Sequence, residues 1–357
     1  MDKLLFQCPT CAGPLTKEEG GYACATCDKT WPVKEGIPRF LDRPIYWGEL
    51  DESEMDQLVE NAENHGWRNA VEYIREKSPV LHQYIADGGR ARWRLALDTD
   101  ENTRVLDLGS GYGSLSVPMA KATGQVVSVD SVPQRAKFLK IRAAQEGLDN
   151  LTVINGDVMR PPLQPEQFDI VILNGMLEWV AVAETEGTPQ EVQLQFLRNV
   201  LSLLREGGHV YIGIENRFGY WAWSGGRDHS GLKYTSLMPK FMANWYVKLK
   251  ARRESFRTDF SKDSYRTYIY SSYGFRKLLQ KAGFQDVRVY TPSPNYNKVN
   301  YFVSIDDPTA YRYFFKTHFS KQTSKVKLLR WLFLKGMRLG LHKVWSSSYG
   351  IIGRKSS

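Results

Sequence analysis

Three glycines at alternate positions, preceded by an acid in an apolar run, form the strongest chemical pattern in the sequence. They are Gly109, Gly111 and Gly113. The apolar run before them contains Asp107, and apolar residues with helical spacing follow from Leu115 to Ala120. Glycine is needed where a backbone turns sharply and approaches a ligand closely, because a Cβ would clash there. The stretch therefore predicts a buried parallel strand, a tight turn and the start of a helix.

Polar residues also end the apolar runs that come next. Asp130 ends the second run, 17 residues after Gly113, and an acid at the tip of a second strand is placed to bind ribose hydroxyls. Asp157 follows the third run, and Asn174 ends the fourth. A fifth run begins after the glycine pair at 207–208. This succession of strand-like runs and helical segments predicts a doubly wound α/β domain.

All four cysteines of the chain lie within its first 27 residues. They are Cys8, Cys11, Cys24 and Cys27, two Cys-x-x-Cys pairs with 12 residues between them. Two such pairs present four thiolates to one tetrahedral ion, and so short a segment has almost no core without the metal. We expect a structural Zn²⁺, since four ligands leave no open coordination position. A metal-free ribbon or a redox pair is the alternative.

The segment 215–239, after the fifth run, combines large aromatic residues with glycines and polar side chains. Such a mixture makes a poor core helix but a suitable wall for a flat or ring-shaped acceptor. His229 is the best candidate for a general base, because imidazole titrates near neutral pH, and Asp228 stands next to it. Glu215 and Asn216, at the tip of the strand, are the next acceptor-side candidates. The alternative is a histidine that only stabilises the loop.

Over roughly Arg90 to Val303, the chain resembles the class I S-adenosylmethionine-dependent methyltransferases. VLDLGSGYG is similar to their first motif and NGMLEWV to their fourth, whereas dinucleotide enzymes seldom carry an acid two residues before the first glycine. The resemblance implies a Rossmann-like seven-stranded methyltransferase sheet, with Asp130 as the ribose acid and Asp157 near the adenine. The implied S-adenosylmethionine-binding residues are Asp107, Gly109, Gly111, Gly113, Asp130, Asp157, Val158 and Asn174. An α/β scaffold that kept the glycines without the nucleotide is the alternative.

Three further details refine this resemblance. WPVKEGIPRFL, after the cysteines, resembles the end of the small zinc-ribbon activator subunit of tRNA and release-factor methyltransferases. The ENR-x-G and DH of the segment 215–239 resemble a loop of class I methyltransferases found with bacterial surface-polysaccharide and glycoconjugate genes. Trp179 stands where related methyltransferases often carry histidine, so no catalytic duty is carried over from the fourth motif.

The pattern predicts four regions along the chain. They are a zinc ribbon at 1–45, a helical linker at 46–100, a methyltransferase core at 101–291 with an acceptor loop at 215–270, and a basic extension at 292–357. The last strand is expected at 348–355, with VNYFVSI at 299–305 as the competing choice. Arg90, Arg92 and Trp93 are candidates for the wall of the cofactor pocket, although a helix that only covers the sheet edge fits equally well.

The net charge of +9 is concentrated near the C-terminus. Residues 308–357 contain 11 Lys or Arg and no acid, so the rest of the chain is slightly acidic. One predicted helical face there carries Leu328, Leu329, Leu332 and Phe333 beside basic residues. It suits an anionic membrane surface, a protein or nucleic-acid partner, or a solvated face. Without a signal-peptide pattern or a run of about 18 apolar residues, we expect a cytoplasmic protein, with peripheral attachment to the inner membrane face as an option.

Together these features favour S-adenosylmethionine-dependent O-methylation of a sugar or another hydroxylated small molecule, including a glycoconjugate. An rRNA or tRNA methyltransferase is the alternative, since some bacterial rRNA guanine methyltransferases join a zinc ribbon to this domain and a basic tail suits phosphate. Strand four, however, lacks the proline- and aromatic-containing signature of many nucleobase methylators. A non-catalytic cofactor-binding activator or scaffold is the third reading, and the intact acids Asp107, Asp130 and Asp157 argue against it.

Overall fold

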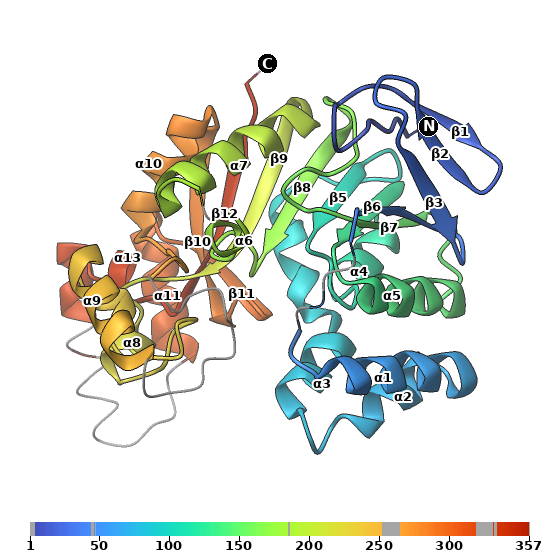
Figure 1. Cartoon of the computed structure of the whole chain (residues 1–357). Coiled ribbons are helices and arrows are strands. Elements are labelled where there is room, and N and C mark those ends of the chain that lie inside the picture. The colour runs from blue at the N-terminus through green and yellow to red at the C-terminus, as the bar shows by residue number, and fades with distance from the viewer. Residues whose placement is uncertain are drawn as a thin grey trace. The chain divides into compact units, whose positions relative to one another are not determined.

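The computed structural model describes residues 4–43, 46, 48–184, 186–251, 265–318, 331 and 334–356. The chain divides into two compact units (Figure 1). The first unit comprises 1–173, 199–210 and 355–357, and the second comprises 174–198 and 211–354. In the part of the chain that is described, no helix is both long and apolar enough to cross a membrane.

The first unit is built on a parallel sheet. Its elements are β1 (Leu15–Glu18), β2 (Gly21–Cys24), β3 (Thr30–Lys34), β4 (Ile37–Phe40), α1 (Glu52–His65), α2 (Trp67–Tyr73), α3 (Pro79–Ala86), the 3-10 helix η1 (Gly88–Ala96), β5 (Arg104–Leu108), α4 (Ser116–Ala120), β6 (Gln125–Asp130), α5 (Pro133–Gln145), β7 (Leu151–Gly156) and β8 (Phe168–Asn174). The strands run β7-β6-β5-β8, all parallel, so Val105 of β5 pairs with Val126 and with Ile170. Because both faces are covered, the strands are apolar throughout, which confirms the predicted α/β class.

The N-terminal ribbon is continuous with this sheet. Strands β1 to β4 pair antiparallel in chain order. β4 then pairs in parallel with β7, where Arg39 lies opposite Asn155 and Phe40 opposite Gly156. Phe40 is buried against the rings of Tyr22 and Trp31. The predicted 1–45 segment therefore ends in a strand that extends the parallel sheet.

The helical region 52–96 packs on α5. Trp67 at the start of α2 donates from its backbone nitrogen to Gln145 Oε1 at 2.7 Å and from its indole to Glu146 at 3.0 Å. The guanidinium of Arg142 lies 4.1 Å from the centre of the Trp67 ring. Apolar residues of α1, α2 and α3 form one buried cluster with Phe138 of α5. This region is thus packed on the first unit and is not an extended linker.

The second unit contains an antiparallel sheet and short helices. Its elements are α6 (Val180–Ala183), most of α7 (Pro189–Leu203), the end of β9 (Leu204–Glu215), α8 (Tyr220–Trp223), the 3-10 helix η2 (Thr235–Leu237), α9 (Lys240–Ala251), α10 (Ser272–Ala282), β10 (Gln285–Asn295), β11 (Lys298–Ser304), α11 (Pro308–His318), the 3-10 helix η4 (Met337–Leu339), α13 (His342–Trp345) and β12 (Ser348–Arg354). α7 and β9 begin in one unit and end in the other. α7 ends at Leu203, and β9 begins directly after it, so the glycine pair 207–208 lies within the strand.

Both segments that competed for the last strand are strands in the structure. β12 and β11 each pair antiparallel with β10, which gives the order β12-β10-β11. Gly283 ends α10 in the left-handed conformation, as its position after the helix predicts. The basic helix face with Leu328, Leu329, Leu332 and Phe333 lies outside the described residues.

Trp67→Ala tests whether the helical region is part of the folded unit. Trp67 is 5 % exposed and has the contacts with α5 given above, so its truncation is expected to cost about 3–5 kcal/mol of unfolding free energy. Tyr73→Ala, at a 72 % exposed position of the same helix, is the control and should cost little. Urea denaturation measures both. Equal effects of the two substitutions would mean that α2 adds nothing to the stability of the unit.

Candidate functional site

The glycine loop after β5 has the backbone shape that its sequence requires. Gly109, Gly111 and Gly113 have φ values of +74°, +53° and +77°, a region that other residues rarely adopt. A Cβ on Gly113 would collide with Leu139 of α5. Ser110 lies in the middle of the loop, and its hydroxyl is buried. This hydroxyl neither donates nor accepts a hydrogen bond among the described residues. The loop therefore leaves room and an unsatisfied polar group for a ligand.

The predicted acids surround this loop. Asp107 is buried at the end of β5 and accepts a 2.6 Å hydrogen bond from the hydroxyl of Ser116. Asp130, at the end of β6, accepts from the backbone nitrogens of Gly111 at 2.7 Å and Val132 at 2.9 Å, and so holds the loop in place. The oxygens of an ionised Asp130 carboxylate have further lone pairs, which could accept hydrogen bonds from two ribose hydroxyls.

Burial governs the charge of these two acids. It raises the pKa of Asp107 to about 6, against the hydrogen bond from Ser116 and the charge of Arg90. Burial also raises the pKa of Asp130, with the charge of Arg135 opposing it. The charge of Arg90 thus acts on Asp107, and its place in the wall of the cofactor pocket stays a prediction. Trp93 is fully buried, which suits the alternative role of covering the sheet edge.

The other predicted cofactor residues lie after β7 and β8. Asp157 and Val158 are half-buried, and Asp157 accepts from the backbone nitrogen of Met159 at 2.8 Å. Asn174 begins the second unit, and both polar atoms of its side chain are buried without a hydrogen-bond partner in the described part of the chain. Such orphaned groups fit a site that a polar ligand completes. Within the first unit, the glycine loop and the acids around it fit S-adenosylmethionine.

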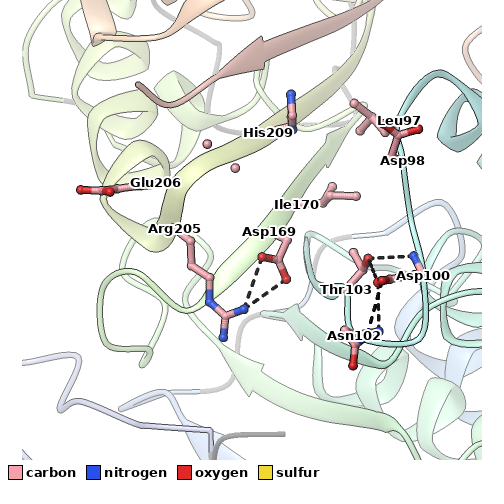
Figure 2. A pocket seen from close by; sticks show the side chains of 12 residues that line it. Leu97, Asp98, Asp100, Asn102, Thr103, Asp169, Ile170, Arg205, Glu206 and His209 are labelled. Carbon is pink, nitrogen blue, oxygen red and sulfur yellow. Dashed lines mark hydrogen bonds and ion pairs between the residues drawn. The ribbon is translucent and has the colours of Figure 1, made fainter. Parts of the chain in front are cut away.

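A pocket of about 390 Å³ lies elsewhere in the first unit. It is lined by residues at the amino ends of β5, β8 and β9, including His209. Figure 2 shows the carboxylate of Asp169 facing the guanidinium of Arg205, at 3.3 and 3.4 Å. In open α/β sheets ligands bind at the carboxyl ends of the strands, so this pocket is not the cofactor site. His209 is therefore away from the glycine loop, as its position in the sequence predicts.

The four cysteines meet at one point. Their Sγ atoms all lie within 4.8 Å of one another, with 3.6 Å between Cys8 and Cys27 and 3.4 Å between Cys11 and Cys24. Thiolates around a tetrahedral Zn²⁺ at about 2.3 Å lie about 3.8 Å apart, whereas a disulfide would bring two sulfurs to about 2.0 Å. All four are free thiols. The donor set and its spacing fit a closed zinc site.

A second cluster of ionisable side chains lies within the second unit. His229 Nε2 is 3.2 Å from Oε2 of Glu215 and 3.6 Å from Oε1 of Glu178. Glu215 ends β9, Glu178 follows β8 by four residues, and His229 belongs to the loop between α8 and η2. Tyr296 donates its hydroxyl to Oε1 of Glu215 at 2.8 Å, and the ring of Trp179 lies 4.6 Å from the imidazole. Four separate segments therefore build this cluster.

The cluster is electrostatically coupled. Burial opposes protonation of His229, but the charges of Glu215 and Glu178 outweigh it and raise the pKa of the imidazole to about 9. Burial and the like charge of Glu215 raise the pKa of Glu178 to about 8. The pKa of Glu215 is lowered despite its burial, because His229 and the Tyr296 hydroxyl stabilise the carboxylate. At neutral pH the imidazole and Glu215 thus form an ion pair in this state.

Two of the candidate residues are hydrogen-bonded to their own surroundings, and their catalytic or acceptor-side roles stay predictions. Asp228 accepts from Ser230 and from the hydroxyl of Tyr265 at 3.2 Å, so it holds its own loop while Glu215 is the hydrogen-bonded partner of His229. Asn216 is buried, and its amide is used for the fold, since it donates to the carbonyls of 344 and 346 and accepts from the backbone of 218. The sequence alone missed Tyr296, because it lies 81 residues after Glu215 and belongs to no motif.

The aromatic segment divides into held and exposed side chains. Trp221 donates its indole hydrogen to the carbonyl of Ser347 at 3.0 Å. Tyr220 and Trp223 of α8 are 59 % and 60 % exposed. Large exposed rings beside a polar cluster are suited to stacking on a ring-shaped ligand, as the sequence predicts for an acceptor wall.

Parts of this chain are similar in sequence to known proteins. Residues 99–242 match the family model described as a methyltransferase domain. The chain is 25 % identical over 254 residues to the S-adenosyl-L-methionine-dependent methyl transferase PigF of Serratia sp., covering 63 % of this chain and 65 % of the relative. It is 30 % identical over 148 residues to a ubiquinone biosynthesis O-methyltransferase of Parvibaculum lavamentivorans, covering 40 % of this chain and 54 % of the relative. The chain thus spans less than two thirds of the length of these curated relatives.

The chain also has a limited similarity to solved structures. Phosphoethanolamine N-methyltransferase 2 of Haemonchus contortus, in complex with S-adenosyl-L-methionine, has a TM-score of 0.43 and 14 % identity, over 84 % of this chain and 60 % of that one. The family match places a methyltransferase domain at 99–242, a range that contains the glycine loop, the acids around it, and Glu178, Glu215 and His229.

Removal of one thiol tests the zinc site. Cys24→Ser should abolish tight binding of one zinc ion and unfold the ribbon, because structural zinc sites supply about 10 kcal/mol or more of folding free energy. Native mass spectrometry measures the zinc content, and proteolysis reports the ribbon. Thr10→Ala, an exposed change between two of the cysteines, is the control. A fully folded, zinc-free wild-type ribbon would contradict the assignment.

Asp107→Asn tests whether a buried charge is kept at a cost to stability. The folded pKa of about 6 exceeds the ordinary value of 3.8, so the folded state binds the extra proton and this contribution to stability falls as the pH rises from about 4 to 6. The variant should therefore be more stable than wild type by up to about 3 kcal/mol at pH 7–8, with no gain near pH 4. It should also bind S-adenosylhomocysteine more weakly.

Urea unfolding at several pH values and calorimetric titration provide the two readouts for Asp107→Asn. Asp149→Asn, which changes an exposed acid in the same way, is the control. A variant that is less stable than wild type at pH 7 would show that the ionised form of Asp107 is stabilised by the fold.

Proposed function

We propose that this chain, whose residues 99–242 form a methyltransferase domain, transfers the methyl group of S-adenosylmethionine to a hydroxyl oxygen of a saccharide or another hydroxylated small molecule. The observation that carries the proposal is the cluster of Glu178, Glu215 and His229 after two consecutive strands of that domain. Glu178 is buried, His229 and Glu215 are half-buried, and Tyr296 supports the coupled cluster, as is common for groups that handle a substrate proton.

The reaction requires that the acceptor oxygen be aligned with the S–CH₃ bond and that the acceptor hydroxyl lose its proton. The acceptor oxygen attacks the methyl carbon, the S–CH₃ bond breaks, and its electron pair stays on sulfur, giving S-adenosylhomocysteine. Because the sulfonium methyl is already activated, the protein has mainly to hold the two reactants in line. The hydroxyl must also lose its proton, and the proposed recipient is His229 in its neutral form, whose share grows as the pH approaches the imidazole pKa of about 9.

We assign the cofactor to the glycine loop and its acids. The open backbone of the loop would receive the methionine part, Asp130 the ribose hydroxyls, and Asp157 with Val158 the adenine. Support comes from the positive φ values and the unsatisfied Ser110 hydroxyl. The ribbon is assigned a structural Zn²⁺, because four thiolates leave no position for a substrate.

An oxygen acceptor is favoured over a nucleobase on two grounds. The relative from Parvibaculum is named as an O-methyltransferase, and the proposed proton acceptor is needed for a hydroxyl but not for a preformed nucleophile. The exposed rings of Tyr220 and Trp223 would then stack on the sugar or ring of the acceptor. Such a reaction suits a cytoplasmic protein, which is our proposal for its location.

His229→Ala tests the proton-transfer role. Turnover should fall about 10²–10⁴-fold, the usual contribution of a positioned proton acceptor, while affinity for S-adenosylhomocysteine stays unchanged. Production of S-adenosylhomocysteine is measured with a panel of hydroxylated acceptors, saccharides first and RNA last. His65→Ala, at an exposed position of α1, is the control and should keep full activity.

Other outcomes of this experiment would contradict the proposal. If His229→Ala kept wild-type turnover, His229 would not be the proton acceptor. If the protein methylated RNA alone, and its affinity for RNA fell steeply as salt was added, the acceptor would be RNA and not a small hydroxylated molecule. Failure of the wild-type protein to bind S-adenosylhomocysteine would overturn methyl transfer itself.

A further inference from the structure

We infer that Glu178, Glu215 and His229 bind a divalent metal ion, separate from the zinc of the cysteine ribbon. The inference deepens the proposed function, on which it rests only for the role of the ion and not for its presence. It stands on the spacing of the three donor atoms and on a buried carboxylate whose oxygens accept no hydrogen bond within the described residues.

The spacing of the donors fits one ion. One oxygen from each glutamate and one imidazole nitrogen all lie within 4.8 Å of one another. The two measured separations from His229 Nε2 are 3.2 Å to Glu215 and 3.6 Å to Glu178. Neighbouring ligands around an ion with bonds of about 2.0–2.2 Å lie about 3.0–3.5 Å apart. Little movement would therefore bring the three donors onto a common centre.

Glu178 is the independent indication of a missing partner. Its side chain is 0 % exposed, and neither of its oxygens accepts a hydrogen bond within the described residues. Its nearest ionic neighbours are the imidazole of His229 and the like-charged Glu215. Buried carboxylates are normally paired, hydrogen-bonded or bound to metal. A cation at this point would neutralise both glutamates and satisfy the orphaned oxygens.

The surroundings hold the ligands in place. The hydroxyl of Tyr296 donates to Oε1 of Glu215 at 2.8 Å, which leaves Oε2 directed to His229. The ring of Trp179 packs on the imidazole with 4.6 Å between ring centres. Partners of this kind orient metal ligands and raise metal affinity. Tyr296 is therefore a positioning residue in this site.

The donor set indicates the class of ion. Two carboxylates and one imidazole without a thiolate suit Mn²⁺, Fe²⁺ or Zn²⁺. Three protein ligands leave coordination positions open, so an acceptor hydroxyl can bind the ion and lose its proton more readily. With the ion bound, the imidazole nitrogen would be a ligand and the proton would pass to solvent, whereas without the ion His229 would accept it. The methyl carbon and the S–CH₃ bond react as described above.

Mn²⁺ is the probe for the experiment, since the soft thiolates of the ribbon select zinc. The zinc-saturated full-length chain is titrated with Mn²⁺ alone and followed by electron paramagnetic resonance. We expect one tight Mn²⁺ per chain, with affinity reduced at least 10-fold in Glu178→Gln and about 10-fold in Tyr296→Phe. Glu60→Gln, an exposed change of the same kind on α1, should bind as wild type does.

A spectroscopic signature separates a ligand from a merely structural residue. Electron spin echo modulation should reveal an imidazole nitrogen coupled to the bound Mn²⁺, and this coupling should vanish in His229→Gln. S-adenosylhomocysteine affinity confirms that each variant is folded. Absence of tight Mn²⁺ binding, or equal affinity in Glu178→Gln and Glu60→Gln, would overturn the metal site.

The two proposals fail in different ways. Tight Mn²⁺ binding without methylation of any hydroxylated acceptor would support the metal site and contradict the proposed function. Methylation that continues after metal removal, in a protein that binds no Mn²⁺, would support the function and overturn the metal site.

Discussion

Burial of carboxylates next to strand ends is the constraint on which the functional parts of both units depend. A carboxylate that is removed from water must find donors or a positive charge, or its pKa rises until it is neutral. Asp107 and Asp130 meet this need in the first unit with a hydroxyl and with backbone nitrogens. Glu215 meets it in the second unit with His229 and Tyr296, whereas Glu178 has no hydrogen-bond donor among the described residues. Asp107, Asp130 and Glu215 are therefore each stabilised by groups from outside their own strand.

The parallel sheet makes this arrangement possible in the first unit. Its strands are covered on both faces, so apolar side chains carry the stability and the strand ends are left for polar residues. The ribbon contributes to the same sheet through the pairing of β4 with β7. The proposed Zn²⁺ would therefore support the edge of the sheet beside β7 as well as the ribbon, because β4 joins the two.

The second unit combines a loop histidine with two glutamates at or after strand ends. Such side chains can bind either a proton or a metal ion. Without an ion, the carboxylates hold the imidazole in its charged form. With an ion, the same three side chains would act as neutral and anionic ligands. The exchange of a proton for a metal needs no new fold, because the donor atoms already lie within reach of one another.

The sequence by itself determined the features that depend on neighbours in the chain. Glycine spacing predicted the positive-φ loop, paired cysteines predicted the thiol cluster, and apolar runs predicted the parallel strands, since each follows from local geometry or burial. Only the tertiary structure decided which groups meet: Glu215 and not Asp228 bonds to His229, and Tyr296 joins them from 81 residues away. The physical reason is that such pairings depend on strand order and on burial. Neither of these is encoded within the few residues around a single side chain.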